Sequence, residues 1–149
     1  MNTGLDGIRR ALPAILLSVL AAPAVAAAED AKSIVGVWRG TSTCVNREAA
    51  PACRDEEVIY EFRELTPPVA GKLSMKADKV VNSKVEPMGE LDFAWDPKEK
   101  AWSCDFQTPR FHGLWSYRVL EGGDLAGTLV LLPDRTLLRK AAAHRMPKS

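Results

Sequence analysis

The sequence contains few of the residues that most often carry catalysis or bind transition metals. Its 149 residues include only two histidines and three cysteines. Neither His112 nor His144 has a second histidine, a serine or an aspartate at a spacing typical of a catalytic triad or a metal site. We therefore expect no catalytic residues, no bound metal, no cofactor and no enzyme activity.

The chain also has almost no net charge. It contains 20 Lys and Arg against 19 Asp and Glu, and 18 of each sign remain once residues 1–28 are set aside. No long run of one sign occurs, so nothing favours nucleic acid or an anionic membrane as a partner. The densest cluster is residues 54–57, RDEE, whose consecutive carboxylates would alternate between the faces of a strand. This predicts a solvated strand end instead of a metal or acid–base site.

Residues 1–28 have the features of an export signal. Arg9 and Arg10 precede an apolar stretch over residues 11–20, and the small residues of 24–28 predict cleavage after Ala28, with a cut two residues earlier nearly as good. The apolar stretch is short and interrupted by prolines, which argues against a stable membrane anchor. We expect a periplasmic or secreted protein whose single domain covers residues 29–149.

Three cysteines in an exported chain predict one disulfide and one remaining thiol. Cys44 and Cys53 are separated by only eight residues, and we expect these two to pair, although pairing through Cys104 stays open. Cys104 alternates in phase with Trp102 and Phe106, which indicates a buried and unreactive thiol.

Apolar residues recur with a period of two through nearly all of the chain after the export signal, which is the pattern of β-strands. In residues 56–64, for example, Val58, Tyr60 and Phe62 share one face and Glu61 and Arg63 the other. No segment has the pattern of an amphipathic helix, and residues 82–88 are expected to form a loop. The predicted strands are residues 34–45, 56–64, 72–81, 89–96, 101–106, 111–120, 125–132 and 136–144.

Eight short strands with turn signals about every ten residues predict an all-β protein. We favour an eight-stranded antiparallel up-and-down barrel, because closure leaves no exposed sheet edge. A β-sandwich is the alternative.

The motif Gly36-Val37-Trp38, at the start of the first predicted strand, resembles the G-x-W signature of the calycins, the superfamily of lipocalins and avidins. The segments GVWRGTSTC, ACRDEEVIYEF, MGELDF and GTLVLLPDRTLLRK also resemble an uncharacterised group of exported bacterial proteins. The calycin resemblance implies that Trp38 closes the base of the barrel and that an arginine near the end of the last strand covers it. Arg139 is the expected covering residue, with Arg135 as the alternative.

Nearly all ten aromatic residues fall on the apolar faces of the predicted strands. Aromatic walls are typical of a pocket for a small molecule, but an eight-stranded barrel is also narrow enough for its own side chains to fill. The candidate ligand-binding residues are Tyr60, Phe62, Phe93, Trp95, Trp102, Trp115 and Tyr117.

Two functions follow from these features. The first is an exported binding protein that holds a small hydrophobic ligand. The alternative is an interaction or inhibitor module that contacts an envelope protein through the loop between Cys44 and Cys53.

Overall fold

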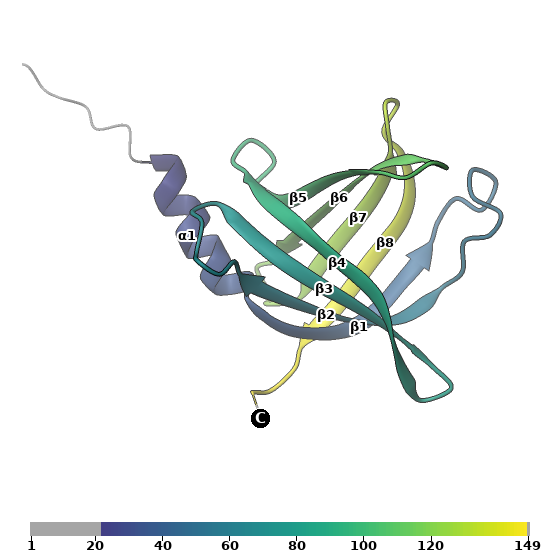
Figure 1. Ribbon diagram of the computed structural model, residues 1–149, viewed down its shortest axis with the longest axis horizontal. Helices are drawn as coiled ribbons and strands as arrows, with labels where there is room; N and C mark the ends of the chain where they lie inside the picture. The colour runs from purple at the N-terminus through teal and green to yellow at the C-terminus, as the bar shows by residue number, and fades with distance from the viewer. Residues whose placement is uncertain (1–21, 149) are drawn as a thin grey trace, which may run out of the picture.

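The computed structural model describes residues 22–148, so most of the predicted export signal lies outside the described residues. One helix is followed by eight strands (Figure 1). The elements are α1 (Ala22–Ile34), β1 (Gly36–Cys44), β2 (Glu56–Glu64), β3 (Lys72–Val81), β4 (Lys84–Asp96), β5 (Ala101–Gln107), β6 (His112–Val119), β7 (Leu125–Leu131) and β8 (Thr136–Arg145). Each strand pairs with the next, and β8 pairs with β1. The predicted antiparallel up-and-down barrel is therefore confirmed.

The prediction of a loop over residues 82–88 is wrong. Asn82 and Ser83 form a two-residue turn with positive φ values of 50° and 64°, and β4 begins directly after it. This is the geometry of the tight turns that join adjacent antiparallel strands. Pro87 is compatible with the strand because β4 has no partner on its other side there, and the β3–β4 register shifts between Ala77 and Asp78.

The barrel is weakly joined between β4 and β5. Only three residue pairs connect these strands, and all three lie at the end of β4, over residues 94–96. The preceding part of β4 pairs with β3 alone, and Figure 1 shows the β3–β4 hairpin extending away from the rest of the barrel. Along most of β4, backbone pairing with β5 therefore does not close the barrel.

The helix α1 was not predicted, and it lies at one end of the barrel, which we call the base (Figure 1). Ala27, Ala31 and Ile34 repeat at helical spacing, and Ala27 and Ile34 are buried. Asp30 Oδ2 accepts a hydrogen bond of 2.5 Å from Trp102 Nε1, and burial raises the pKa of Asp30. The predicted cleavage position after Ala28 lies within this helix.

Trp38 lies at the base, fully buried, and its Nε1 donates a 2.8 Å hydrogen bond to the carbonyl oxygen of Ile34. The arginine that covers it is Arg145, whose guanidinium carbon lies 4.2 Å from the ring centroid. The prediction that Arg139 covers Trp38 is wrong. The β1–β8 register pairs Trp38 with Arg145 and places Arg139 beside Cys44, near the other end of β1. Arg135 lies in the turn that precedes β8 and does not cover Trp38 either.

The core fills the half of the barrel nearest the base. Its central side chains are Phe62, Phe93 and Tyr117, whose rings meet edge to face at centroid distances of 5.5–5.9 Å. All three are at most 1% exposed. Edge-to-face contacts of this kind stabilise a core beyond the simple burial of area, by about 0.5–1.5 kcal/mol a pair.

Candidate ligand-binding site

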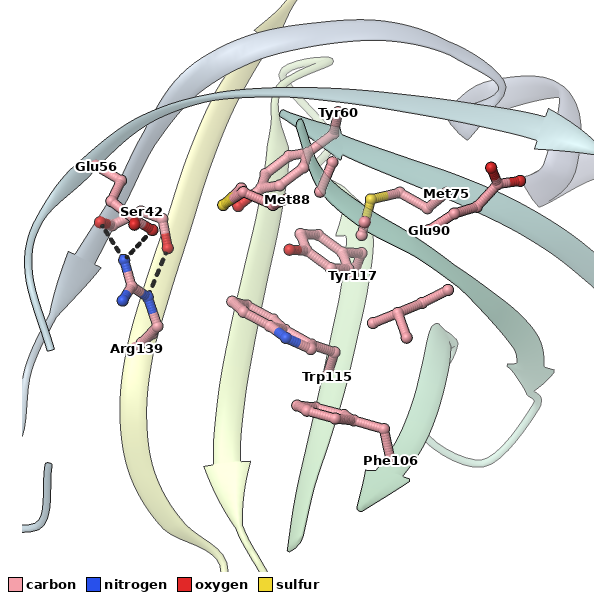
Figure 2. Close-up of a pocket in the computed structure, with 13 residues that line it drawn as sticks. Ser42, Glu56, Tyr60, Met75, Met88, Glu90, Phe106, Trp115, Tyr117 and Arg139 are labelled. Atoms are coloured by element: carbon pink, nitrogen blue, oxygen red, sulfur yellow. Dashed lines mark hydrogen bonds and ion pairs between the residues drawn. The ribbon is translucent and has the colours of Figure 1, made fainter. Parts of the chain in front are cut away.

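A pocket of about 370 Å³ occupies the half of the barrel away from the base. Its apolar wall comes from β2 to β6, and its polar residues come mainly from β1, β2 and β8 (Figure 2). The residues that line it are Ser42, Glu56, Tyr60, Met75, Ala77, Met88, Gly89, Glu90, Leu91, Phe106, Trp115, Tyr117 and Arg139. Because β4 and β5 are unpaired beside Met88–Leu91, this side of the pocket is not closed by a sheet.

The structure brings three of the seven predicted ligand-binding residues to this pocket: Tyr60, Trp115 and Tyr117. Phe62 and Phe93 point to the same interior but lie in the core beneath it. Two alternate residues of a strand are about 6.6 Å apart along it, so neighbours on one face can lie at different depths.

Trp95 and Trp102 lie near the base and not in the pocket. Their residues pair across β4 and β5, and their ring centroids are 5.4 Å apart. Trp102 is fully buried against Asp30 of α1. Trp95 lines a separate depression beside the same helix. They do not line this pocket, because they occupy the barrel end that α1 covers.

One side of the pocket is formed by a row of aromatic side chains. The rings of Trp115 and Tyr117 are stacked, with centroids 5.3 Å apart and an angle of 16° between their planes. Figure 2 shows Phe106, Trp115 and Tyr117 in sequence along one side, with Met75 and Met88 reaching in from the strands opposite. The methionines were not predicted: Met75 is on the apolar face of a predicted strand, and Met88 fell in the segment assigned to a loop.

The ring of Tyr117 is held against the barrel wall by the absence of a side chain at Gly127. The two residues are paired between β6 and β7, and a Cβ on Gly127 would lie 2.6 Å from Tyr117 Cδ1. Tyr117 is 1% exposed, and its hydroxyl oxygen is shielded from solvent. Burial raises the pKa of Tyr117 well above 10.0, and the neighbouring Tyr60 raises it further. The phenol of Tyr117 is therefore neutral and shielded from solvent.

The polar end of the pocket is organised by Arg139. Its Nε donates to Ser42 Oγ at 2.9 Å, and its Nη2 donates to Glu56 Oε2 and to the carbonyl oxygen of Ser42, both at 3.0 Å (Figure 2). The same Nη2 lies 2.9 Å from the carbonyl oxygen of Arg54, and Nη1 lies 3.2 Å from Cys53 Sγ. The side chains of Arg139 and Glu56 are 13% and 29% exposed. This is a largely buried ion pair in which the charge of Arg139 is already neutralised.

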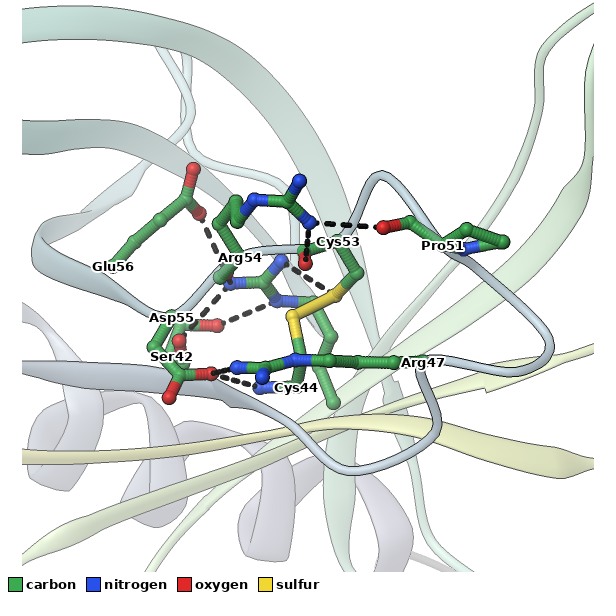
Figure 3. Close-up of polar contacts among 9 residues, drawn as sticks. Ser42, Cys44, Arg47, Pro51, Cys53, Arg54, Asp55 and Glu56 are labelled. Carbon is green, nitrogen blue, oxygen red and sulfur yellow. Dashed lines mark hydrogen bonds and ion pairs between the residues drawn. A yellow bond between two sulfur atoms is a disulfide. The ribbon is translucent and has the colours of Figure 1, made fainter.

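The disulfide between Cys44 and Cys53 is confirmed, and it closes the loop that leads into β2 (Figure 3). Polar groups of this loop bind one another: Arg54 Nη1 donates to the carbonyl oxygens of Pro51 and Cys53, both at 2.9 Å. Asp55 Oδ1 accepts from the backbone N–H of Cys44 at 2.8 Å and from Arg47 at 3.3 Å. The loop is thus fixed by side chains as well as by its disulfide.

Residues 54–57 were predicted to be a solvated strand end, and this holds only in part. Asp55 and Glu57 are more than 40% exposed, and Glu57 binds Arg39 on the outer surface. Glu56 alternates to the inside and reaches Arg139. The side chains alternate between the two faces as expected, but the inward-pointing one, Glu56, lines the pocket and is not at a solvated strand end.

Asp55 gives the structure a pH-dependent contact. The hydrogen bond from Cys44, helped by the charge of Arg47, lowers the pKa of Asp55 below its ordinary 3.8. A lowered folded-state pKa contributes stability above the unfolded-state pKa, and this contribution is lost as pH falls through the folded-state pKa. We expect Asp55→Asn to be less stable than the wild type in urea at neutral pH. This difference in stability should disappear as the pH falls through the lowered pKa of Asp55. A stability difference that does not change with pH would contradict this assignment.

The other candidate residues lie outside the pocket. Cys104 is buried, as predicted, and burial raises the pKa of its thiol. His112 and His144 pair at the surface with Asp105 and Asp124. Within residues 22–148, no group of three or more His, Cys, Asp or Glu side chains is placed to hold a metal ion. The same residues include no helix with both the length and the apolar character needed to cross a membrane.

No protein-family model matches the sequence, and no curated protein matches it either. Relatives therefore add nothing to the resemblance to calycins or to exported bacterial proteins. The fold itself rests on the register of the strands, which closes an eight-stranded antiparallel barrel with Trp38 at its base.

Proposed function

We propose that the protein is a periplasmic or secreted β-barrel that binds a small hydrophobic ligand in the pocket described above. One observation carries this proposal: the packed core lies in the half of the barrel near the base, and the other half holds a 370 Å³ pocket lined by Trp115, Phe106 and two methionines. Pockets for small molecules start at about 300 Å³ and combine apolar walls with a few polar groups. The disulfide fits an oxidising compartment outside the cytoplasm.

The two open interpretations of the aromatic residues apply to different parts of the barrel. Phe62 and Phe93 belong to a filled core, whereas Trp115 and Phe106 stand in the wall of the pocket. Apolar surface that faces a cavity loses the contacts it would make in a packed interior, and a hydrophobic ligand would restore them. The alternative role, an interaction through the disulfide loop, has less support because the polar groups of that loop bind one another.

The proposal is tested by ligand binding to the exported protein. Native mass spectrometry after gentle purification from a bacterial periplasm should show a small, dissociable adduct. Titration with neutral hydrophobic molecules should change tryptophan fluorescence, and the change should disappear in Trp115→Phe, which removes the indole that lines the pocket.

The matched control is Trp95→Phe, because Trp95 lies near the base beside α1. This variant should keep the fluorescence response to ligand. A bare protein mass together with unchanged fluorescence across a broad ligand panel would overturn the proposal. A response that is lost in Trp95→Phe and kept in Trp115→Phe would place the ligand elsewhere and would overturn it as well.

A further inference from the structure

The edge of β4 that faces β5 is unpaired over most of its length. Residues 84–93 pair with no described strand except β3, and residues 104–107 of β5 pair only with β6. Along an antiparallel pair, successive residues direct their N–H and C=O groups alternately toward and away from the partner strand. Both facing edges therefore carry backbone donors and acceptors that no described strand bonds. Sheet edges of this kind can take up an extended peptide as an additional strand.

The free edge of β4 also borders the pocket. Glu90 points to the outer surface, where its carboxylate binds Arg63 at 2.8 Å and accepts from Ser74 Oγ. It nevertheless lines the pocket together with its neighbour Leu91. A Cβ on Gly89 would meet nothing within 4 Å, so open space adjoins the backbone here. A chain paired with this edge would direct every second side chain toward the row of aromatic side chains.

The outer part of the same edge is protected against pairing. Pro87 has no N–H to donate, and the β3–β4 register shifts between Ala77 and Asp78, directly beside it. Prolines and bulges are features that keep exposed sheet edges from pairing with other chains. Neither feature lies within residues 89–93, the part of the edge beside the pocket. Pairing is therefore favoured there and not along the outer hairpin.

Two carboxylates flank the opening between β4 and β5 on the outer surface. Continuing the β4–β5 register would place Asp92 directly opposite Asp105, and like charges in opposite positions disfavour pairing. Burial, Asp105 and Asp92, in that order, raise the pKa of the Cys104 thiol, so both carboxylates act on the same part of β5. Asp105 binds His112 at 2.5 Å, whereas Asp92 forms no ion pair with a described residue. A basic side chain on an added strand would therefore be attracted here.

We propose that the free edge of β4 over residues 89–93 is a docking site for an extended segment of a partner polypeptide. The segment pairs with the β4 backbone, places alternate apolar side chains in the pocket and directs a basic side chain toward Asp92 and Asp105. The inference goes beyond the proposed function, because the backbone of the occupant is bound as well as an apolar group.

Calorimetric titration with synthetic peptides tests this docking site. The probe is the blocked pentapeptide acetyl-Leu-Lys-Phe-Lys-Leu-amide, which alternates apolar and basic side chains. A copy N-methylated at every residue keeps the side chains but donates no backbone hydrogen bond, and a third peptide has glutamate in place of both lysines. The protein should bind the probe at least about tenfold more tightly than either, because the first loses backbone hydrogen bonds and the second exchanges attraction for repulsion. Equal binding of the N-methylated copy would overturn the inference.

A charge change on β4 assigns the site. Asp92 is exposed, so Asp92→Lys should fold, and circular dichroism checks this. Its new charge balances that of Asp105 and should reduce the preference for the lysine peptide over the glutamate peptide to about one. The matched control is Glu121→Lys, which makes the same change in the turn between β6 and β7 and should keep the wild-type preference. If Asp92→Lys fails to fold, Asp92→Asn should still reduce the preference to about threefold. An unchanged preference in the Asp92 variants would overturn the inference.

These outcomes are distinct from failure of the proposed function. Binding of neutral hydrophobic molecules without binding of the probe peptide would overturn the docking site and leave the proposed function standing. Binding of the peptide without such molecules would support the docking site and count against the proposed function. Sedimentation of the protein alone should give a monomer. A dimer that Asp92→Lys dissociates would show that a second copy occupies the edge, which would overturn the assignment to a partner polypeptide.

Discussion

Gly40→Ala is expected to lower the free energy of unfolding by about 3 kcal/mol, at the upper end of the usual cost of overpacking. A Cβ at this position would overlap the carbonyl oxygen of Ala142 and lie 2.5 Å from Ala143 Cα. Both atoms belong to the backbone of β8, which pairs with β1 where the barrel closes. No side-chain rotation relieves such an overlap, so the two strands have to separate.

Urea denaturation of the two proteins, followed by circular dichroism, measures this difference. Gly122→Ala is the matched control, because a Cβ on Gly122 meets nothing within 4 Å. Its effect should stay within about 0.5 kcal/mol of zero, as for most surface substitutions. Equal stability of the two variants would show that β1 and β8 do not approach as closely at Gly40 as the structure describes.

The fold was predictable because alternation of side chains is a local property of the chain. Val58, Tyr60 and Phe62 occupy one face in the sequence pattern, and all three are buried in the barrel. The start of β4 was missed for a local reason too. Pro87 suggested a loop, but the strand tolerates a proline at this position because β5 does not pair with β4 there. The turn at Asn82 and Ser83 also lacks the glycine that usually marks such turns.

The closure of the base was not predictable in detail, because it depends on register between distant segments. The resemblance to calycins implied that an arginine from the last strand would cover Trp38, but only the β1–β8 register distinguishes Arg145 from Arg139. The helix α1 was hidden for another reason. Its alanine-rich sequence is favourable for a helix and equally typical of the end of an export signal, so composition alone did not separate the two.

The sequence predicted which side chains point into the barrel, but not how deep in the barrel each of them lies. Tyr60 and Phe62 lie on the same side of β2 and both pack in the core, yet of the two only Tyr60 also lines the pocket. Their depth depends on how far the strands are staggered around the barrel and on what fills the base. The polar end was missed because Glu56 and Arg139 are far apart in sequence, and only the closed barrel places their charges in contact.

Arg139→Met is expected to destabilise the protein by about 2–3 kcal/mol. The value lies between the cost of breaking a fully buried ion pair, about 3–5 kcal/mol, and that of an exposed pair, up to about 1 kcal/mol. Glu56 is 29% exposed, so water compensates for part of the lost partner. The substitution also removes the donor that serves the carbonyl oxygens of Ser42 and Arg54.

A double-mutant cycle separates the ion pair from these other contacts. Glu56→Gln keeps an acceptor oxygen of similar size and should cost about 1 kcal/mol, whereas the double variant should be more stable than the sum of the single effects by at least about 1 kcal/mol. Additive effects would show that Glu56 and Arg139 are not coupled. The same Arg139 variant also tests the position of this residue. On β8, Arg139 lies six residues before Arg145, which is the residue paired with Trp38. Arg139→Met should leave the near-ultraviolet signal of the buried Trp38 unchanged, whereas Arg145→Met should alter it.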